Sequence, residues 1–207
     1  MDAKRAEEIG ETYRGIMADI KVRMLSINQI IRDPGHLHPR LVKEYCFLQL
    51  RKIIELVALG CVVAHDDLVS SKLKRLRKTY HPDAILAALA GLEDDFFPRA
   101  VVVTNTPTKS FVDDAEEHGL TADELRKMWG VIGAELHSGT VDKLNKQADV
   151  LRSQPEVRAH QRRLVDLLSH HMIMMANRTQ TLICVMESTS TKELNVVFGE
   201  AIPADES

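Results

Sequence analysis

Aromatic residues and long apolar runs are both scarce in this sequence. Phe, Trp and Tyr make up 4% of the 207 residues, and Trp129 is the only tryptophan. A surface that stacks several bases of a single nucleic-acid strand needs more aromatic side chains than that. Glu55 and Gly60 interrupt the most apolar stretch, so no run reaches the ~18 residues of a membrane-spanning helix. We therefore expect neither a multi-base stacking surface nor a membrane protein.

Cysteine is scarce as well. The three cysteines lie in apolar surroundings and show no Cys-x-x-Cys spacing: Cys46, Cys61 and Cys184. This pattern excludes a disulfide scaffold and favours small core residues in a reducing compartment. The first residues are charged and lack the apolar segment of a secretory signal peptide. We expect a cytoplasmic protein.

Neither sign of charge dominates. A formal net charge of −3 excludes a protein whose entire surface binds nucleic acid, although a local patch is allowed. The adjacent His170 and His171 lack metal-ligand spacing, because two ligands on one helix face lie three or four residues apart. We expect no metal and no cofactor.

The most apolar helix-compatible stretch predicts a central helix over residues 40–65. Apolar residues recur there at steps of three and four around most of the cylinder, and Pro39 gives a start signal. Three ionisable residues, Glu44, Arg51 and Glu55, fall on one side of this helix. Arg51 and Glu55 are one turn apart and can pair, either as a structural ion pair or as part of a binding site.

A second long helix is predicted over residues 3–31, ending at Asp33-Pro34-Gly35. Its apolar residues form a seam with steps of four and three: Tyr13, Met17, Ile20, Met24, Ile27 and Ile31. Such a seam needs a partner helix. The partner is either the central helix of the same chain or the seam of a second copy in a homodimer.

A basic run follows the central helix: Lys72, Lys74, Arg75, Arg77 and Lys78. It is either a solvated helix face or a phosphate-binding patch. A capping box of Thr121 with Glu124 then starts another helix, in which Trp129 belongs to the predicted buried stripe. Beside that stripe, small residues including Gly133 place His137 near a helix crossing. His137 is either a core histidine with one satisfied nitrogen or a ligand-binding group.

The remaining elements complete a mainly α (α+β) fold. We predict a short helix over 141–153, a longer one from Pro155 to about Met175, a buried strand over 100–104 and a loop or short helix over 105–119. Two apolar β-type runs, 181–186 and 194–198, read as an antiparallel hairpin. The expected architecture is a helical bundle over 1–178 around the central buried helix. The hairpin, 179–202, packs on the bundle within a single domain, and strand 100–104 is available to join it.

Three segments together resemble uncharacterised bacterial proteins with a helical-bundle core: residues 44–55, the helix end at Leu136-His137, and the closing hairpin. That core is similar to the HEPN (higher eukaryote and prokaryote nucleotide-binding) superfamily, and the resemblance covers most of the chain in layout. Catalytic HEPN members are metal-independent ribonucleases in paired bundles. In them an Arg and a His on one helix, with four to six intervening residues, activate the ribose 2′-hydroxyl and stabilise the scissile phosphate.

Three pairs in this chain have that spacing: Arg32 with His38, Arg75 with His81, and Arg163 with His170. Chance alone yields about two such pairs in a chain of this composition. Only Arg163 and His170 fall within one predicted helix. Leu164 stands where the catalytic members carry a polar residue after the arginine.

Two functions of different class follow. The first is a non-catalytic cytoplasmic module that binds a nucleotide, nucleic acid or protein partner through Arg51, Glu55 and His137, or through the basic run. The alternative is a metal-independent HEPN-type ribonuclease of a toxin or defence system that uses Arg163 and His170. We favour the first, because the sequence contains no nucleophile elbow, P-loop, glycine-rich phosphate cradle or metal-binding motif.

Overall fold

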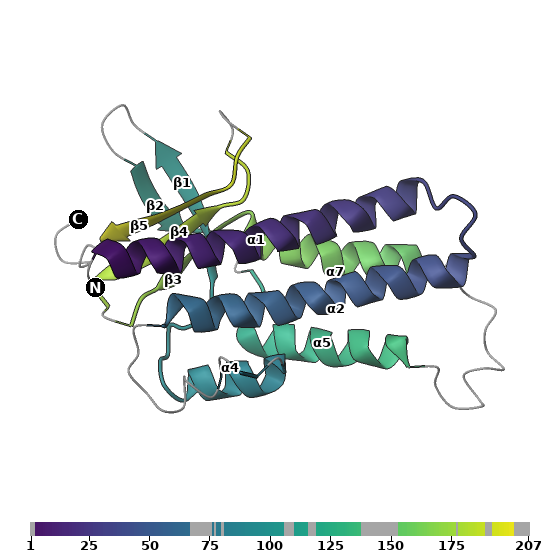
Figure 1. Ribbon diagram of the computed structural model, residues 1–207, viewed down its shortest axis with the longest axis horizontal. Coiled ribbons are helices and arrows are strands. Elements are labelled where there is room, and N and C mark those ends of the chain that lie inside the picture. The colour runs from purple at the N-terminus through teal and green to yellow at the C-terminus, as the bar shows by residue number, and fades with distance from the viewer. Residues whose placement is uncertain are drawn as a thin grey trace.

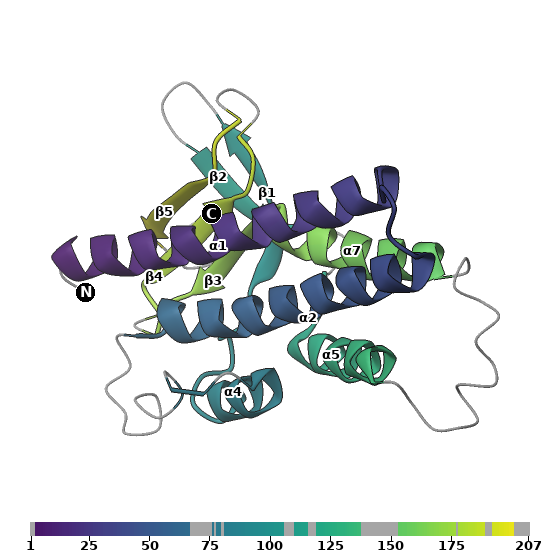
Figure 2. The same ribbon diagram turned by 45° about the vertical axis from the view of Figure 1, so that its right-hand side comes forward.

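The computed structural model describes residues 3–66, 76, 78–79, 81–105, 110–115, 119–137, 153–176, 178–188 and 192–200. Within these ranges the helices are α1 (Ala3–Arg32), α2 (Pro39–Ala64), α4 (Pro82–Ala90), α5 (Ala122–Leu136) and α7 (Ser153–Leu168). The strands are β1 (Arg99–Asn105), β2 (Ser110–Asp114), β3 (His170–Met174), β4 (Gln180–Val185) and β5 (Asn195–Glu200). Figures 1 and 2 show α1 and α2 side by side, with α4 and α5 on the other side of α2 and the sheet behind α1.

The strands form one curled antiparallel sheet in the order β2-β1-β3-β4-β5. The predicted helical bundle with a single hairpin is therefore wrong, and the fold is α+β. The predicted hairpin is present as β4 and β5, in which Leu182 lies opposite Phe198. The predicted strand 100–104 is present as β1, but it pairs with β2 and β3 rather than with the hairpin.

Strand β3 occupies the end of what the sequence predicted to be a helix up to Met175. Helix α7 ends at Leu168 instead. In the strand that follows, His171 and Ile173 are buried and alternate with half-buried neighbours, which is the period of two of a strand. The steps from Leu168 to His171 and on to Met175 also fit a helix, and that ambiguity produced the wrong prediction.

Helix α2 is central, as predicted, but it is not covered on every side. It contacts α1, α4, α5 and α7. Its inward residues are fully or almost fully buried: Phe47, Leu50, Ile53, Ile54, Val57, Ala58 and Cys61. On its outer face Leu41 and Leu48 remain 49% and 42% exposed. The expectation of a helix enclosed all round is thus corrected, and charged residues near the outer face can reach water.

The apolar seam of α1 packs within the same chain. Tyr13, Met17, Ile20 and Ile27 are buried in the core. A Cβ added at Gly60 of α2 would lie 3.1 Å from the Tyr13 ring, which measures how closely the two helices approach. A homodimer through this seam would require α1 to leave the core.

A buried hydrogen-bond pair links α1 to the sheet. The Tyr13 hydroxyl lies 2.7 Å from Nε2 of His171, and Nδ1 of His171 lies 2.9 Å from the Leu168 carbonyl oxygen. Because a carbonyl can only accept, Nδ1 carries the proton and Nε2 accepts from the tyrosine. Burial lowers the pKa of His171 to about 4 and raises the pKa of Tyr13, so both groups are neutral near pH 7.

No helix in the described ranges combines the length and the apolar character needed to cross a bilayer.

Candidate functional site

Arg51 and Glu55 form the predicted pair on α2. Nε of Arg51 lies 3.4 Å from Oε1 of Glu55, and the amine of Lys52 lies 2.7 Å from the other carboxylate oxygen. The Arg51 side chain is 27% exposed and the Glu55 side chain 12% exposed. The pair therefore lies at the edge of the core, where the arginine still reaches solvent.

Arg51 stacks on Trp129 of α5. The guanidinium carbon lies 4.2 Å from the centre of the indole ring, which is a cation–π contact. Gly133, one turn further along α5, makes room for the arginine: a Cβ at this position would lie 2.6 Å from Nη1. The sequence predicted that small residues here would admit another backbone. The structure shows that Gly133 admits a guanidinium.

A third element reaches the same indole. The ring of His81, directly before α4, lies 4.6 Å from the Trp129 ring, edge to face. His81 occupies the N-cap position of α4, but its side chain makes no capping hydrogen bond and is exposed. An ion pair of Arg126 with Asp83, at 2.7 Å, holds α5 against α4 beside this contact. We call the cluster of Arg51, Lys52, Glu55, His81, Trp129 and Gly133 the Arg51 site.

Several donors of the Arg51 site have no acceptor within the part of the chain that the structure describes. Nη1 and Nη2 of Arg51 make no hydrogen bond there, and the indole nitrogen of Trp129 is shielded from solvent without a partner. The guanidinium is therefore oriented by Glu55 on one edge and by the indole on one face. Nη1 packs against Gly133 of α5, and the side chain as a whole is 27% exposed.

The structure does not bring the other two predicted binding residues to this site. Glu44 pairs with Arg40, at 2.9 Å, one turn before it on α2. His137 lies just beyond the end of α5 and is exposed. It is four residues past Gly133, or about 6 Å further along the helix axis.

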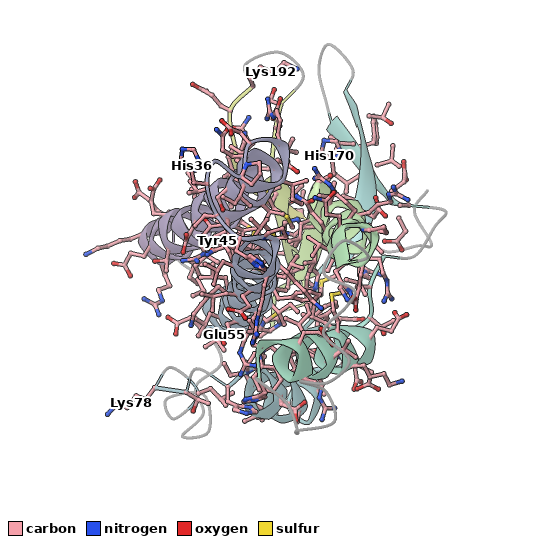
Figure 3. All side chains as sticks on the ribbon, turned by 90° about the vertical axis from the view of Figure 1, so that its right-hand side faces the viewer. His36, Tyr45, Glu55, Lys78, His170 and Lys192 are labelled. Atoms are coloured by element: carbon pink, nitrogen blue, oxygen red, sulfur yellow. The ribbon has the colours of Figure 1, made fainter. Side chains whose placement is uncertain are left out.

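The basic run is described only at Lys78, which is exposed. Lys72, Lys74, Arg75 and Arg77 lie outside the described residues. Lys78 precedes His81 by three residues, so their backbones are at most about 11 Å apart. Figure 3 shows Lys78 and Glu55 on the same side of the molecule. This face therefore carries positive charge beyond Arg51 and Lys52.

The candidate ribonuclease residues do not share a helix. Arg163 lies on α7 and pairs with Glu124 at 2.8 Å, whereas His170 is the first residue of β3 and is half-buried. In Figure 3 His170 lies above and to the right of Glu55, away from it. For the second pair, Arg32 ends α1 and His38 caps α2 by accepting from the Arg40 amide. The prediction that Arg163 and His170 lie within one helix is wrong.

Two polar groups in the core were not anticipated from the sequence. His65, at the end of α2, is fully buried, with Nδ1 2.9 Å from the Cys61 carbonyl oxygen and Nε2 without a partner among the described residues. Glu93 pairs with Arg178 at 2.6 Å. Burial acts to raise the pKa of Glu93, but the hydrogen bond and the charge of Arg178 lower it overall. The contact of Glu93 joins segments 85 residues apart, so no local pattern predicts it, whereas the His65 contact lies within one helical turn.

No group of three His, Cys, Asp or Glu side chains within the described ranges is arranged to hold a metal ion. Comparisons of the chain with protein-family models, curated proteins and solved structures gave no match. The function therefore has to be inferred from the Arg51 site.

Proposed function

We propose that this chain is a non-catalytic binding module for a nucleotide or nucleic acid, and that the Arg51 site holds the ligand. One observation carries the proposal: Glu55 and Trp129 hold a partly exposed guanidinium whose Nη1 and Nη2 make no hydrogen bond within the described residues. The planar fork of an arginine matches two oxygens of a phosphate. Because neighbouring side chains already hold its orientation, little side-chain freedom remains to be lost on binding.

The surrounding charge supports a phosphate ligand. Lys52 is adjacent and 48% exposed, and Lys78 lies on the same side of the molecule. Glu55 neutralises one of these charges, which leaves the face positive. Cations near a binding edge raise the local concentration of anionic ligands. The resemblance to nucleotide-binding HEPN proteins points to the same ligand class, by analogy alone.

The ribonuclease alternative has weaker support. Arg163 and His170 come from different elements, and Glu124 already neutralises the charge of Arg163. A phosphate at that position would have to displace a carboxylate. For the compartment we propose the cytoplasm, because all three cysteines are buried free thiols, as expected of a protein in a reducing environment.

The test is a binding titration with labelled nucleotide and with labelled single-stranded RNA. Substituting Arg51→Gln should weaken binding about ten- to a hundredfold, since a hydrogen bond to a charged group contributes roughly 1.5–3 kcal/mol. The matched control is Arg163→Gln, which removes an exposed arginine that is also paired with a glutamate. It should leave binding unchanged.

Two results would contradict the proposal. One is equal affinity of the wild type and Arg51→Gln for every ligand, with both proteins folded. The other is metal-independent RNA cleavage that His170→Ala abolishes without lowering the melting temperature.

A further inference from the structure

The side of α2 that faces away from the core carries a regular row of residues. Successive members are four, three, four, three and four positions apart, which keeps them on one side of the helix, as in a coiled coil. We call them the outer row of α2: Leu41, Tyr45, Leu48, Lys52, Glu55 and Leu59. In Figures 1 and 2 no other helix or strand of the described residues lies in front of α2. A row with this spacing is typical of a helix that packs against another helix.

Most of the outer row is apolar, and part of it is in contact with solvent. Leu41 and Leu48 are 49% and 42% exposed. Tyr45, between them, and Leu59, at the other end of the row, are half-buried. Covering these side chains would remove apolar surface from water, which is the main favourable contribution to most protein association.

The order of the residues fits a second copy of the chain that runs in the opposite direction. Leu48, Lys52, Glu55 and Leu59 are spaced four, three and four apart, and this spacing is the same when it is read backwards. In an antiparallel pair of α2 helices, Leu48 of each copy therefore lies opposite Leu59 of the other. Lys52 of each copy likewise lies opposite Glu55 of the other. The row is thus complementary to itself in both apolar contact and charge.

The charges also decide between the two directions in which the helices could pair. A parallel pair in register would place Lys52 opposite Lys52 and Glu55 opposite Glu55. Like charges that face each other across an interface cost free energy, whereas opposite charges fix the orientation and the register of paired helices. The Lys52 side chain is 48% exposed, so its amine is free to reach the carboxylate of a partner.

From these observations we propose that two copies of the chain associate through the outer row of α2, with the two helices antiparallel across a twofold axis. Each copy then presents the same surface to the other, as a twofold dimer requires. The proposal does not rest on the ligand of the Arg51 site. The Arg51 side chain extends toward Trp129 of α5 and lies beside the outer row rather than in it.

We expect this association to be weak. One helix face from each copy covers less than the ~800 Å² per partner of a stable complex, so the dissociation constant should be on the order of 10 µM. Protein diluted well below about 1 µM is then monomeric, by mass action. The outer row is in contact with water in the dilute protein, and the stability measured there is that of the monomer.

The first test is sedimentation of the full chain over about 1–100 µM. The mass of the wild type should rise with concentration from that of one chain toward twice that value. Leu48→Lys places a charge in the middle of the outer row and should weaken association at least tenfold. Val165→Lys is the matched control, because Val165 is 43% exposed, as Leu48 is, but lies on α7. It should associate like the wild type.

The second test exchanges the charges. Lys52→Glu makes both central positions acidic, and Glu55→Lys makes both of them basic. Each variant alone should associate at least tenfold more weakly than the wild type, because like charges then face each other. An equimolar mixture of the two should form a heterodimer, because opposite charges face each other at both positions. Melting temperatures show that each variant is folded, and if Glu55→Lys does not fold, the comparison of Leu48→Lys with Val165→Lys decides.

Three results would overturn the proposal. A wild type that stays monomeric up to about 100 µM, well above the expected dissociation constant, would leave the outer row without a second copy. Equal association of Leu48→Lys and Val165→Lys would mean that another surface joins the copies. If the two charge variants are folded but their mixture stays monomeric, the antiparallel pairing of Lys52 with Glu55 is wrong. None of these results bears on ligand binding by Arg51, which its own titration tests.

Discussion

The hydroxyl of Tyr13 donates a hydrogen bond to Nε2 of His171, 2.7 Å away, and both side chains are buried in the core. The other imidazole nitrogen lies 2.9 Å from the Leu168 carbonyl oxygen, so each polar atom of the histidine ring is satisfied. A neutral histidine is therefore built into the contact between α1 and β3, and both groups serve stability rather than ligand binding.

The first prediction concerns pH. Burial lowers the pKa of His171 to about 4, whereas a histidine in an unfolded chain titrates near ~6.5. Between these values the unfolded chain binds a proton that the folded chain does not, so acidification favours unfolding. This contribution is fully present above about pH 6.5 and should fall by roughly 3 kcal/mol on reaching about pH 4. Urea unfolding from pH 7.5 to pH 4 measures it.

Two variants isolate the histidine from other titrating groups. His171→Gln should flatten the pH dependence over this range, whatever its effect on stability at pH 7. His36→Gln removes an exposed histidine and should leave the slope as it is in the wild type. Equal slopes for all three proteins would show that His171 is not buried in its neutral form.

The second prediction concerns Tyr13→Phe. This substitution keeps the ring but leaves Nε2 of His171 buried without a donor, which should cost about 1–3 kcal/mol of unfolding free energy. Tyr45→Phe, on the half-buried side of α2, is the control and should change stability by less than about 0.5 kcal/mol. Chemical denaturation at pH 7.5 compares the two. Similar small effects for both variants would argue against the Tyr13–His171 bond.

The third prediction follows from the two faces of α2. Leu50 is fully buried, whereas Leu48 is 42% exposed. Leu50→Ala should lower the unfolding free energy by about 2–5 kcal/mol. Leu48→Ala should cost less than about 1 kcal/mol, because much of this side chain is in water in the folded protein too. A large loss at Leu48 would mean that the outer face of α2 is covered in solution.

The fourth prediction concerns the cysteines. Burial raises the pKa of Cys46 to about 11 and the pKa of Cys61 and Cys184 to about 12. Since the thiolate is the reactive form, none of the three should react with DTNB in the folded protein at pH 8. All three should react at once in 6 M guanidinium. A thiol that reacts within minutes under native conditions would place that cysteine at the surface.

Local signals in the sequence were sufficient for the starts of α2 and α5. The capping box of Thr121 and Glu124 is present with both of its hydrogen bonds. Pro39, predicted to start the central helix, is the first residue of α2, and Pro82 is likewise the first residue of α4. The capping box and the helix-starting prolines depend only on residues within one helical turn of each other. They can therefore be predicted from a single sequence.

The site was only partly predictable. The pairing of Arg51 with Glu55 follows from their spacing on one helix and is confirmed. Trp129 of α5 contacts Arg51 of α2 and His81, which directly precedes α4. The sequence alone does not show which of these helices pack against each other. His137 was placed near the pair because it lies on the same predicted helix as the small residues. The helix ends first, and the side chain is left in solvent.

Strands β2 and β3 were missed because they depend on pairing with other strands of the sheet. Ser110–Asp114 carries two acidic residues and has no strand pattern of its own, yet Val112 pairs with Val103 of β1. Strand β3 fits a helical spacing when taken alone, and it becomes a strand because β1 and β4 pair with it on either side. Pairing between distant segments overrides weak local preferences.

The bond between Tyr13 and His171 spans 158 residues, and this separation matters while the protein is being made. At about 5–20 residues per second, a ribosome needs roughly 8–30 s to add the histidine after the tyrosine has been polymerised. During that interval the seam of α1 can meet α2 but not the strand that later covers it. The apolar residues of this seam that face β3 in the folded protein therefore stay uncovered for many seconds, and transiently exposed apolar surface is prone to aggregation.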